Sequence, residues 1–275
     1  MNSIKTVNAA ETVYGAEWRR SLDGDSAEAY HEASKLYKQL AFRQTDTYVL
    51  QANPNALVST TRSVKKWSHA PATALPAPTL PNVSLGEILM RRRSQNVFAS
   101  KPVTLSQLAT VLFAACGVTK RVPVTGGEQQ VFRTAPSGGA LYPLDCYVAV
   151  HRVDDLAPGL YYYDPLTHAL GTVRGESVAE ALADACVYPD AVLTGAATLL
   201  FGGVFWRSRF KYRLRAYRFT VLEAGHVAQN ALLAADALGL GALPLGGFYD
   251  GAVDRLLDLD GVNEGTLYAV ALGAR

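Results

Sequence analysis

The chain has 275 residues, of which 49% are hydrophobic and 18% are charged, and its formal net charge is +2. This composition is typical of a globular protein and excludes extensive disorder. A charge so close to zero gives no general attraction to nucleic acid or to an anionic membrane, so neither is expected as a partner.

The cysteines and the first residues predict a cytoplasmic protein without a metal site. Cys116, Cys146 and Cys186 are widely spaced and odd in number, which favours neither a disulfide framework nor a zinc site. The N-terminal sequence lacks the apolar stretch of a signal peptide. The most apolar run, from Thr194 to Trp206, is too short to cross a bilayer.

Residues 1–81 are expected to form an N-terminal helix and a proline-rich connector, and residues 82–275 the main domain. Asp25-Ser-Ala-Glu28 has the form of a capping box that opens a helix through about Phe42. Between Asn53 and Pro81 five prolines and repeated alanines indicate an extended connector rather than a separate domain.

Further capping boxes, at Ser84-Leu-Gly-Glu87 and Thr104-Leu-Ser-Gln107, predict two helices, the second running through Ala115. The polar loop between Gly117 and Arg133 is expected to be a hairpin tip or a flap. Apolar runs and helical periodicity predict the remaining strands at 146–150, 160–163, 169–173, 196–205, 243–248 and 267–273, and helices at 176–187, 219–238 and 250–257. Several hairpin-like pairs beside a long helix indicate an α+β sandwich with a mostly antiparallel sheet.

The stretch from Arg133 to Asp145, Arg-Thr-Ala-Pro-Ser-Gly-Gly-Ala-Leu-Tyr-Pro-Leu-Asp, contains the most specific pattern of the chain. Gly138 and Gly139 permit positive φ angles and let a flat or anionic ligand approach backbone N–H groups. Ser137 adds a hydroxyl that can donate or accept. A lone Ser-Gly-Gly sequence is also typical of a tight turn before a strand.

The longer string, Arg-x-x-Pro-Ser-Gly-Gly-Ala-Leu-Tyr-Pro, resembles the signature of the SagB-type flavin dehydrogenases, a branch of the FMN-dependent nitroreductase superfamily. The resemblance covers residues 84–273 and, weakly, the N-terminal helix. It implies a nitroreductase-like sandwich and a homodimer that binds FMN between its subunits. One subunit would contribute the Arg92 segment and the other Ser137, Gly138 and Gly139.

Two more segments agree with this resemblance. The string from Arg92 to Phe98 resembles the Arg-x-Ser-x-basic-x-aromatic motif that holds the FMN phosphate and ribityl chain, which implicates Arg92, Arg93, Ser94 and Asn96. Arginine suits a phosphate because its planar fork gives bidentate bonds, although arginines at a helix end also suit the helix dipole. Asn96 stands where a basic residue is usual, so one positive charge is missing.

Gly246 and Gly247 match the loop that places a backbone N–H against flavin N5 in nitroreductase relatives. Glycine suits this position because a side chain would push the flavin ring away.

Between Arg207 and Arg218 basic residues alternate with apolar ones, a period of two that suits an edge strand with one cationic face. The resemblance assigns two of these residues another role, because Lys211 and Tyr212 match a Lys-Tyr pair that precedes the long helix. We carry them over as the catalytic pair, with Tyr212 as the base and the charge of Lys211 stabilising its phenolate. Sequence neighbours share one site only if the backbone turns there.

The helix predicted over 219–238 is apolar nearly all round, which is typical of a buried or subunit-interface helix. Its polar residues recur at steps of three and four, and we interpret this stripe as structural: Glu223, His226, Gln229 and Asn230.

The resemblance implies an FMN-dependent dehydrogenase that oxidises thiazoline or oxazoline rings to azoles in a modified peptide, in company with a cyclodehydratase. A reductase or oxidase of another small or peptide substrate, using NAD(P)H or oxygen, is an alternative on the same scaffold. A non-catalytic subunit of a peptide-modifying complex is the alternative outside enzymes, and Asn96 is its only support.

Overall fold

The computed structural model describes residues 25–38, 64–65, 72–124 and 127–275. The chain divides into two compact units, Met1–Gln44 and Thr45–Arg275. The predicted connector over 53–81 is described only at residues 64–65 and 72–81.

Helix α3 (Ser26–Ala33) lies in the first unit and begins where the sequence predicts. The Asp25 carboxylate accepts a hydrogen bond from the Ala27 N–H at 2.9 Å, as expected of an N-cap. The predicted end at Phe42 is wrong over residues 34–38, which are not α-helical, and residues 39–42 lie outside the described residues. The helix closes early because the Ser34 hydroxyl and the Lys35 N–H bond to the carbonyls of its last turn.

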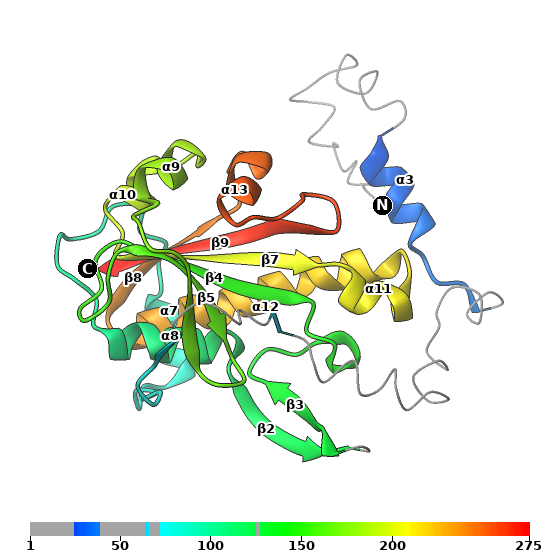
Figure 1. Cartoon of the computed structure of the whole chain (residues 1–275), viewed down its shortest axis with the longest axis horizontal. Coiled ribbons are helices and arrows are strands. Elements are labelled where there is room, and N and C mark those ends of the chain that lie inside the picture. Colours follow the sequence, from blue (N-terminus) through cyan, green and yellow to red (C-terminus); the bar gives the residue numbers. More distant parts are fainter. Residues whose placement is uncertain (1–24, 39–63, 66–71, 125–126) are drawn as a thin grey trace, which may run out of the picture. The chain divides into compact units, whose positions relative to one another are not determined.

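The second unit contains a sheet of seven described strands in the order β1-β6-β5-β4-β7-β9-β8, every neighbour antiparallel (Figure 1). The strands are β1 (Ala72–Ala74), β4 (Leu144–Val150), β5 (Gly159–Asp164), β6 (Ala169–Arg174), β7 (Ala197–Val204), β8 (Leu240–Leu245) and β9 (Glu264–Ala274). The predicted α+β fold with a mostly antiparallel sheet is confirmed. The end of the predicted connector supplies edge strand β1.

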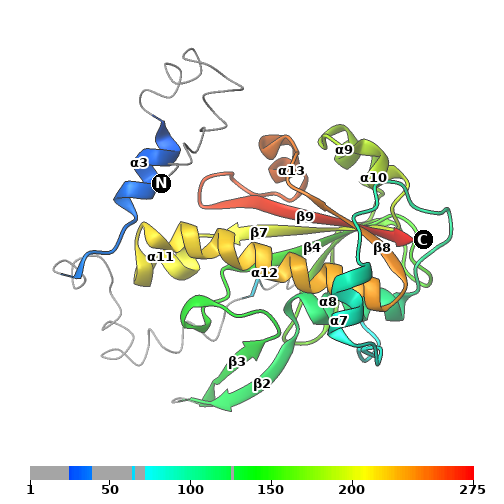
Figure 2. The same ribbon diagram turned by 180° about the vertical axis from the view of Figure 1, so that it is seen from behind.

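Helices cover both faces of this sheet (Figures 1 and 2). On one face lie α8 (Leu105–Cys116) and α12 (Arg215–Ala237), with α7 (Leu85–Arg91) against α12; on the other lie α9 (Ala179–Asp184), α10 (Pro189–Leu193) and α13 (Asp250–Leu256). Strand β4 shows why both faces are covered, because its successive side chains point to opposite faces and all are buried. Cys146 and Val148 pack in the core beneath α8 and α12, while Tyr147 and Ala149 pack in the core beneath α9, α10 and α13.

The predicted starts of α7 and α8 are confirmed by their caps. Ser84 Oγ accepts from the Glu87 N–H at 3.2 Å, and Thr104 and Gln107 form a reciprocal capping box. The predicted hairpin is also present, as β2 (Val118–Pro123) and β3 (Gln129–Arg133), which form a separate two-stranded ribbon within the described chain (Figure 1).

The alternating basic run does not form an edge strand. Residues Trp206–Tyr212 form helix α11, Arg213 breaks it with a φ of +49°, and α12 begins at Arg215. A helix forms because Ser208 and Lys211, three residues apart, are buried together on one face of α11. Burial on one helical face thus overrides the period-two charge pattern.

Helix α12 is not buried all round, contrary to its apolar sequence. Glu223 is buried, whereas His226 and Gln229, three and six residues further on, are exposed, as are Val221 and Leu222. The polar stripe is therefore split between the core and the surface.

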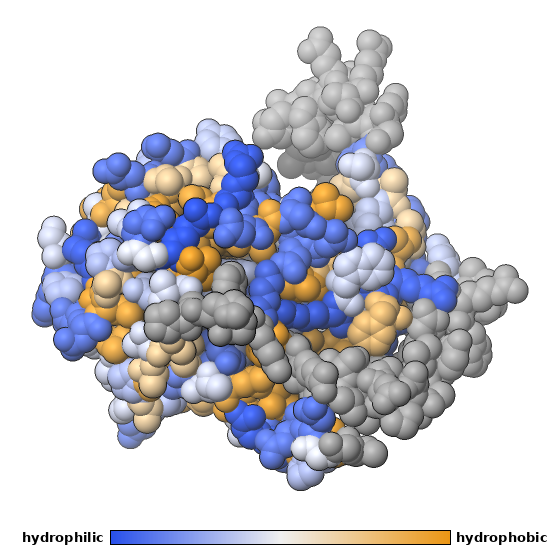
Figure 3. All heavy atoms as spheres, viewed as in Figure 1, coloured by the Kyte–Doolittle hydropathy of each residue, from blue (hydrophilic) through white to orange (hydrophobic). Residues whose placement is uncertain are grey.

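No helix in the described parts of the chain is long and apolar enough to span a membrane. On the face drawn in Figure 3, hydrophilic and hydrophobic residues are interspersed.

Candidate active site

The Ser-Gly-Gly stretch forms a short 3-10 turn, η3 (Gly138–Ala140), that leads towards β4. Gly139, Ala140 and Tyr142 all have left-handed backbone, with φ of +67°, +53° and +46°. Such angles are costly for residues with a Cβ, so surrounding contacts must hold them. The Tyr142 N–H donates to Ser137 Oγ at 2.9 Å, and its hydroxyl accepts from the Arg133 N–H at 2.9 Å.

Lys211 and Tyr212 come together at this turn. A Cβ placed on Gly139 would lie 2.6 Å from Lys211 Nζ and 2.7 Å from the Tyr212 hydroxyl oxygen, so both side-chain tips meet the bare Cα. The ammonium also lies 5.0 Å from the centre of the Tyr212 ring. The two residues therefore share one site with Gly139, and the backbone does turn there, at Arg213.

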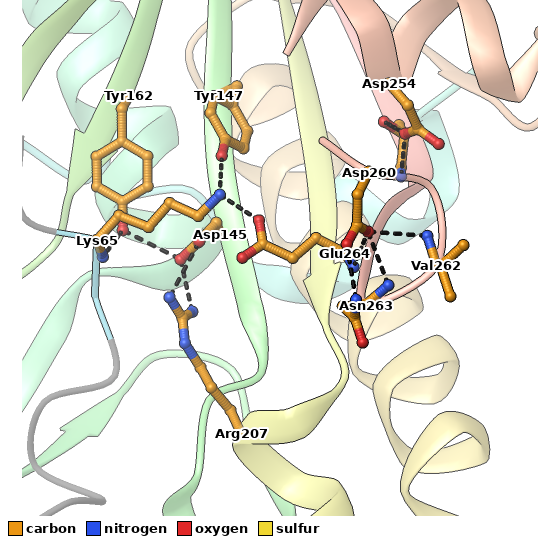
Figure 4. A network of polar contacts seen from close by, with 11 residues as sticks. Lys65, Asp145, Tyr147, Tyr162, Arg207, Asp254, Asp260, Val262, Asn263 and Glu264 are labelled. Atoms are coloured by element: carbon orange, nitrogen blue, oxygen red, sulfur yellow. Dashed lines mark hydrogen bonds and ion pairs between the residues drawn. The ribbon is translucent and has the colours of Figure 1, made fainter. Parts of the chain in front are cut away.

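A buried ion pair holds α11 in this position (Figure 4). The Arg207 guanidinium donates to both Asp145 oxygens, at 2.6 and 3.1 Å, and Asp145 is only 2% exposed. Burial would lower the pKa of Arg207, but the adjacent Asp145 carboxylate outweighs it and raises that pKa. Because Asp145 lies on β4, directly after the turn, this pair fixes α11 to the strand that carries the other half of the site.

Residue 65 of the connector joins the same cluster (Figure 4). Lys65 Nζ donates to the Tyr147 hydroxyl at 2.9 Å and pairs with Glu264, and the Lys65 N–H donates to the Tyr162 hydroxyl at 3.0 Å. The Tyr162 hydroxyl in turn donates to Asp145 at 3.0 Å. The sequence alone did not predict that Lys65, Asp145 and Arg207 support the site. The one local signal was Asp145 itself, a carboxylate at the start of an apolar strand, which indicates a buried charge that needs a partner.

Glu223 of α12 lies directly behind the turn. Its side chain is 5% exposed and lines a small cavity together with Arg133 and Tyr142. Burial raises the pKa of Glu223 to about 7, although Ser137 and the charge of Arg133 act in the opposite direction. Glu223 was interpreted as structural from the sequence, and this cavity places it next to the candidate site.

The predicted phosphate-binding segment follows α7. The Arg93 side chain is exposed and donates to the carbonyl oxygens of Met90 and Arg92, with no carboxylate partner among the described residues. Ser94 forms a parallel bridge with Ala242 of β8, and Asn96 is exposed. The exposed guanidinium and the serine lie at the surface, where a phosphate could reach them.

Gly246 and Gly247 follow β8 directly, so the turn they form and the Ser94 segment lie along the same edge strand. The Gly247 carbonyl accepts from the Val187 N–H at 2.9 Å. A Cβ on Gly247 would lie 3.1 Å from the Val187 side chain, so a larger residue there would require Val187 to shift by a few tenths of an ångström.

The two groups of predicted contacts lie at opposite ends of α12. At the start of the helix, a Cβ on Gly138 would lie 3.4 Å from the Phe219 ring. At its end, Arg91 Nε lies 2.7 Å from Asp236 Oδ2, directly before the Arg92 segment. At 1.5 Å per residue, about 25 Å of helix separates Phe219 from Asp236. One chain thus brings Lys211 and Tyr212 to the Ser137 turn but keeps the Arg92 segment away from it.

We predict that Asp145→Asn lowers the free energy of unfolding by about 3–5 kcal/mol, because it leaves the buried Arg207 charge without its counter-ion. Urea unfolding measures this loss. The control is Asp258→Asn, which breaks the ion pair between Asp258 and Arg174. Because the Asp258 side chain is 63% exposed, this substitution should lower the free energy of unfolding by less than about 1 kcal/mol. Equal losses in the two variants would show that Asp145 does not anchor α11.

We also predict that Gly139→Ala costs about 1–2 kcal/mol, because alanine resists a φ of +67°. The new methyl group should also displace the tips of Lys211 and Tyr212. Gly138→Ala is the matched control, since its Cβ would make ordinary contact with Phe219. Urea unfolding and a crystal structure of each variant test this; equal stability in both variants would contradict the described turn.

Comparisons with known proteins identify the family. Residues 89–274 match the model of the nitroreductase family. The protein MJ1384 of Methanocaldococcus jannaschii, named as a nitroreductase, is 35% identical over 182 residues, which cover 66% of this chain and 88% of that protein.

Two similar proteins are named for peptide processing. The microcin B17-processing protein McbC of Escherichia coli is 33% identical over 139 residues, covering 47% of this chain and 50% of McbC. The trifolitoxin-processing protein TfxB of Rhizobium leguminosarum bv. trifolii is 29% identical over 176 residues, covering 61% of this chain and 46% of TfxB. The similarity thus spans half or less of each of these two proteins.

Solved structures agree with the fold. A structure named as a nitroreductase from Anabaena variabilis superposes with a TM-score of 0.68 at 29% identity, covering 90% of this chain and 45% of that one. The Escherichia coli microcin synthetase McbBCD complex gives a TM-score of 0.57 at 23% identity over 99% of both chains, which shows the shared fold alone. The family match and the MJ1384 relative show that the chain belongs to the nitroreductase family.

Proposed function

We propose that this protein is an FMN-dependent dehydrogenase that oxidises thiazoline or oxazoline rings to azoles in a ribosomally made, modified peptide. The main support for the proposal is that Lys211 and Tyr212 lie together at the Gly139 turn. The Tyr212 hydroxyl is a proton acceptor, the Lys211 ammonium is a cation beside it, and Gly139 has no side chain that would block access to them. The nitroreductase family commonly binds FMN. The two peptide-processing relatives support a peptide as substrate.

The residues present fit an FMN. Arg92, Arg93 and Ser94 would hold the phosphate and ribityl chain, with Asn96 as a further donor, because the Arg93 guanidinium is exposed and bonds only carbonyl oxygens within the described chain. Ser137, Gly138 and Gly139 would hold the flavin ring on one side, and Gly246 and Gly247 its N5 edge. Both glycine turns leave backbone exposed, as close approach of a flat ring requires.

The Arg92 segment and the Ser137 turn lie at opposite ends of α12, and this separation supports a homodimer in which each FMN lies between subunits. The exposed face of α12 carries apolar side chains, since Tyr217 is 45%, Val221 44% and Leu222 56% exposed. Burying such a face against a second copy would remove it from water. The same contact would bring the Arg92 segment of one subunit to the Ser137 turn of the other.

Oxidation of an azoline removes two hydrogens from the ring, one as a proton and one as a hydride. Bound FMN supplies the hydride acceptor. Tyr212 Oη would accept the ring proton, and the Lys211 ammonium beside it would stabilise the resulting phenolate. Gly139 keeps the space beside both tips clear. Azolines arise by cyclodehydration of serine, threonine or cysteine residues, so a cyclodehydratase is the proposed partner.

We predict that the purified protein is yellow and releases FMN on denaturation. Arg93→Ala should weaken FMN binding, because it removes a charge-assisted contact with the phosphate. The matched control is Arg121→Ala, since Arg121 is exposed on β2 and donates to the Leu166 carbonyl. Flavin fluorescence titration measures both. A protein that cannot be reconstituted with FMN would contradict the proposed function.

The catalytic pair is tested by single-turnover bleaching of the flavin with an azoline peptide under nitrogen. Tyr212→Phe keeps the ring but loses the proton acceptor, so bleaching should slow by roughly a hundred- to ten-thousand-fold. Lys211→Ala should also slow it, and the double variant should be little worse than either single one if the two act together. Flavin affinity of Tyr212→Phe should be unchanged. Bleaching at full speed would exclude Tyr212 as the base, and NADPH turnover without peptide would favour a reductase.

A further inference from the structure

We propose that Lys65 is a positioning residue for the catalytic pair: it clamps two facing tyrosines of the sheet and, through them and Glu264, holds the start of helix α11 (Figure 4). Lys65 belongs to the predicted connector, so this segment helps to place Lys211 and Tyr212 as well as linking parts of the chain. The inference rests on the proposed function only in the catalytic role given to that pair.

Lys65 binds both members of a cross-strand tyrosine pair. Tyr147 of β4 and Tyr162 of β5 lie directly opposite each other, and their rings meet edge-on with centroids 5.6 Å apart. The Lys65 N–H donates to the Tyr162 hydroxyl at 3.0 Å, and Lys65 Nζ donates to the Tyr147 hydroxyl at 2.9 Å. Backbone and side chain of one residue are thus fixed together, so we expect loss of the ammonium contacts to release the N–H as well.

The first route from Lys65 to α11 runs through Tyr162 and Asp145. The Tyr162 hydroxyl accepts from the Lys65 N–H and donates to Asp145 Oδ1 at 3.0 Å. The same oxygen receives Arg207 Nη1 at 2.6 Å. A carboxylate rotates easily about its last side-chain bond, so a second donor on Oδ1 fixes its plane. The Arg207 fork needs that plane because its two bonds reach both oxygens, and Lys211 lies one helical turn beyond Arg207.

The second route runs through the start of β9. Lys65 Nζ forms an ion pair with Glu264, whose Cα partner in the sheet is Val204 of β7, two residues before α11 begins. The adjoining Asn263 holds the same junction, because its side-chain oxygen accepts from Nε1 of Trp206, the first residue of α11, at 2.7 Å. Lys65 therefore supports α11 at its first residue as well as, by the first route, within its first turn.

The charges of this cluster favour the clamp. The Lys65 and Glu264 side chains are only 24% and 28% exposed, so water screens their ion pair less than it screens a fully exposed one. Burial would lower the pKa of Lys65, but its hydrogen bonds to Glu264 and Tyr147 outweigh burial and raise that pKa. Lys65 therefore stays charged at neutral pH, and its removal would leave Glu264 without this counter-ion.

Amide hydrogen exchange of the ligand-free full chain tests the clamp, because exchange reports how often a helix opens. Lys65→Ala should raise exchange over Trp206–Tyr212 by roughly 2- to 10-fold, the effect of losing about one hydrogen bond, and leave exchange over Leu105–Cys116 of α8 unchanged. Lys65→Arg keeps a cation with several donors and should exchange as the unmodified protein does. The control is Lys120→Ala, which should change neither helix because Lys120 is exposed on β2. Unchanged α11 exchange in Lys65→Ala, or equal increases in α11 and α8, would overturn the inference.

Tyr162→Phe tests the first route, because it keeps the ring and removes only the hydroxyl between Lys65 and Asp145. This variant should also raise exchange in α11. In the Tyr162→Phe background, the factor by which Lys65→Ala raises that exchange should be smaller than in the unmodified protein, since one of its two routes is already broken. Two factors that multiply in full would show that Lys65 does not act through Tyr162, which overturns the inference.

Flavin bleaching by an azoline peptide under nitrogen separates this inference from the proposed function. Lys65→Ala should bleach roughly 2- to 10-fold more slowly, the effect of about one hydrogen bond, and Lys65→Arg should restore the rate. Flavin affinity should be the same in all three proteins, because Lys65 contacts Tyr147, Tyr162 and Glu264, outside the proposed flavin contacts. Bleaching of Lys65→Ala at the full rate, despite faster exchange in α11, would overturn the positioning role. Absence of bleaching in the unmodified protein would contradict the proposed function, and the exchange measurements then decide the inference alone.

Discussion

The pairing of Asp145 with Arg207 is the interaction on which the candidate site depends. Asp145 stands at the start of a strand that is buried along its whole length, so its carboxylate needs a counter-ion in the core. Arg207 supplies it from α11 with two hydrogen bonds, and a fork with two bonds fixes direction as well as distance. Since Lys211 is one helical turn beyond Arg207, the same pair sets where the Lys211 and Tyr212 tips lie relative to the Gly139 turn.

Local signals predicted most of the fold because they act within a few residues. The side chains of Ser84 and Thr104 satisfy the first N–H groups of their own helices, so α7 and α8 begin where the sequence indicates. The predicted end of α3 was wrong because the periodic stripe of apolar residues continues in the sequence after Ala33. Hydrogen bonds from the Ser34 hydroxyl and the Lys35 N–H to carbonyls of the last turn already close the helix there. Periodicity cannot register that competition.

The basic run shows why part of the site could not be predicted. Its charge alternation favours a strand, but the decisive contact joins Arg207 to Asp145, 62 positions away in the chain. Likewise the sequence places Glu223 on a polar stripe with His226, and only the fold separates the buried carboxyl from the exposed imidazole. The glycine turn and the Lys-Tyr pair were found through their resemblance to a family, whereas the groups that hold them depend on long-range pairing and carry no local pattern.

Helix α12 combines these constraints into one architecture. Its first half presents Phe219 and Glu223 to the Ser137 turn, and its end holds Arg91 through Asp236, which is 2% exposed. Both contacts are fixed by burial, so the helix keeps the two groups of predicted flavin contacts about 25 Å apart in any conformation that preserves the core. A flexible hinge could not unite them without exposing Asp236 or Glu223. In the homodimer that we propose, a second copy packed against the exposed side of α12 would unite them without any such cost, which favours a two-subunit site over closure of one subunit on itself.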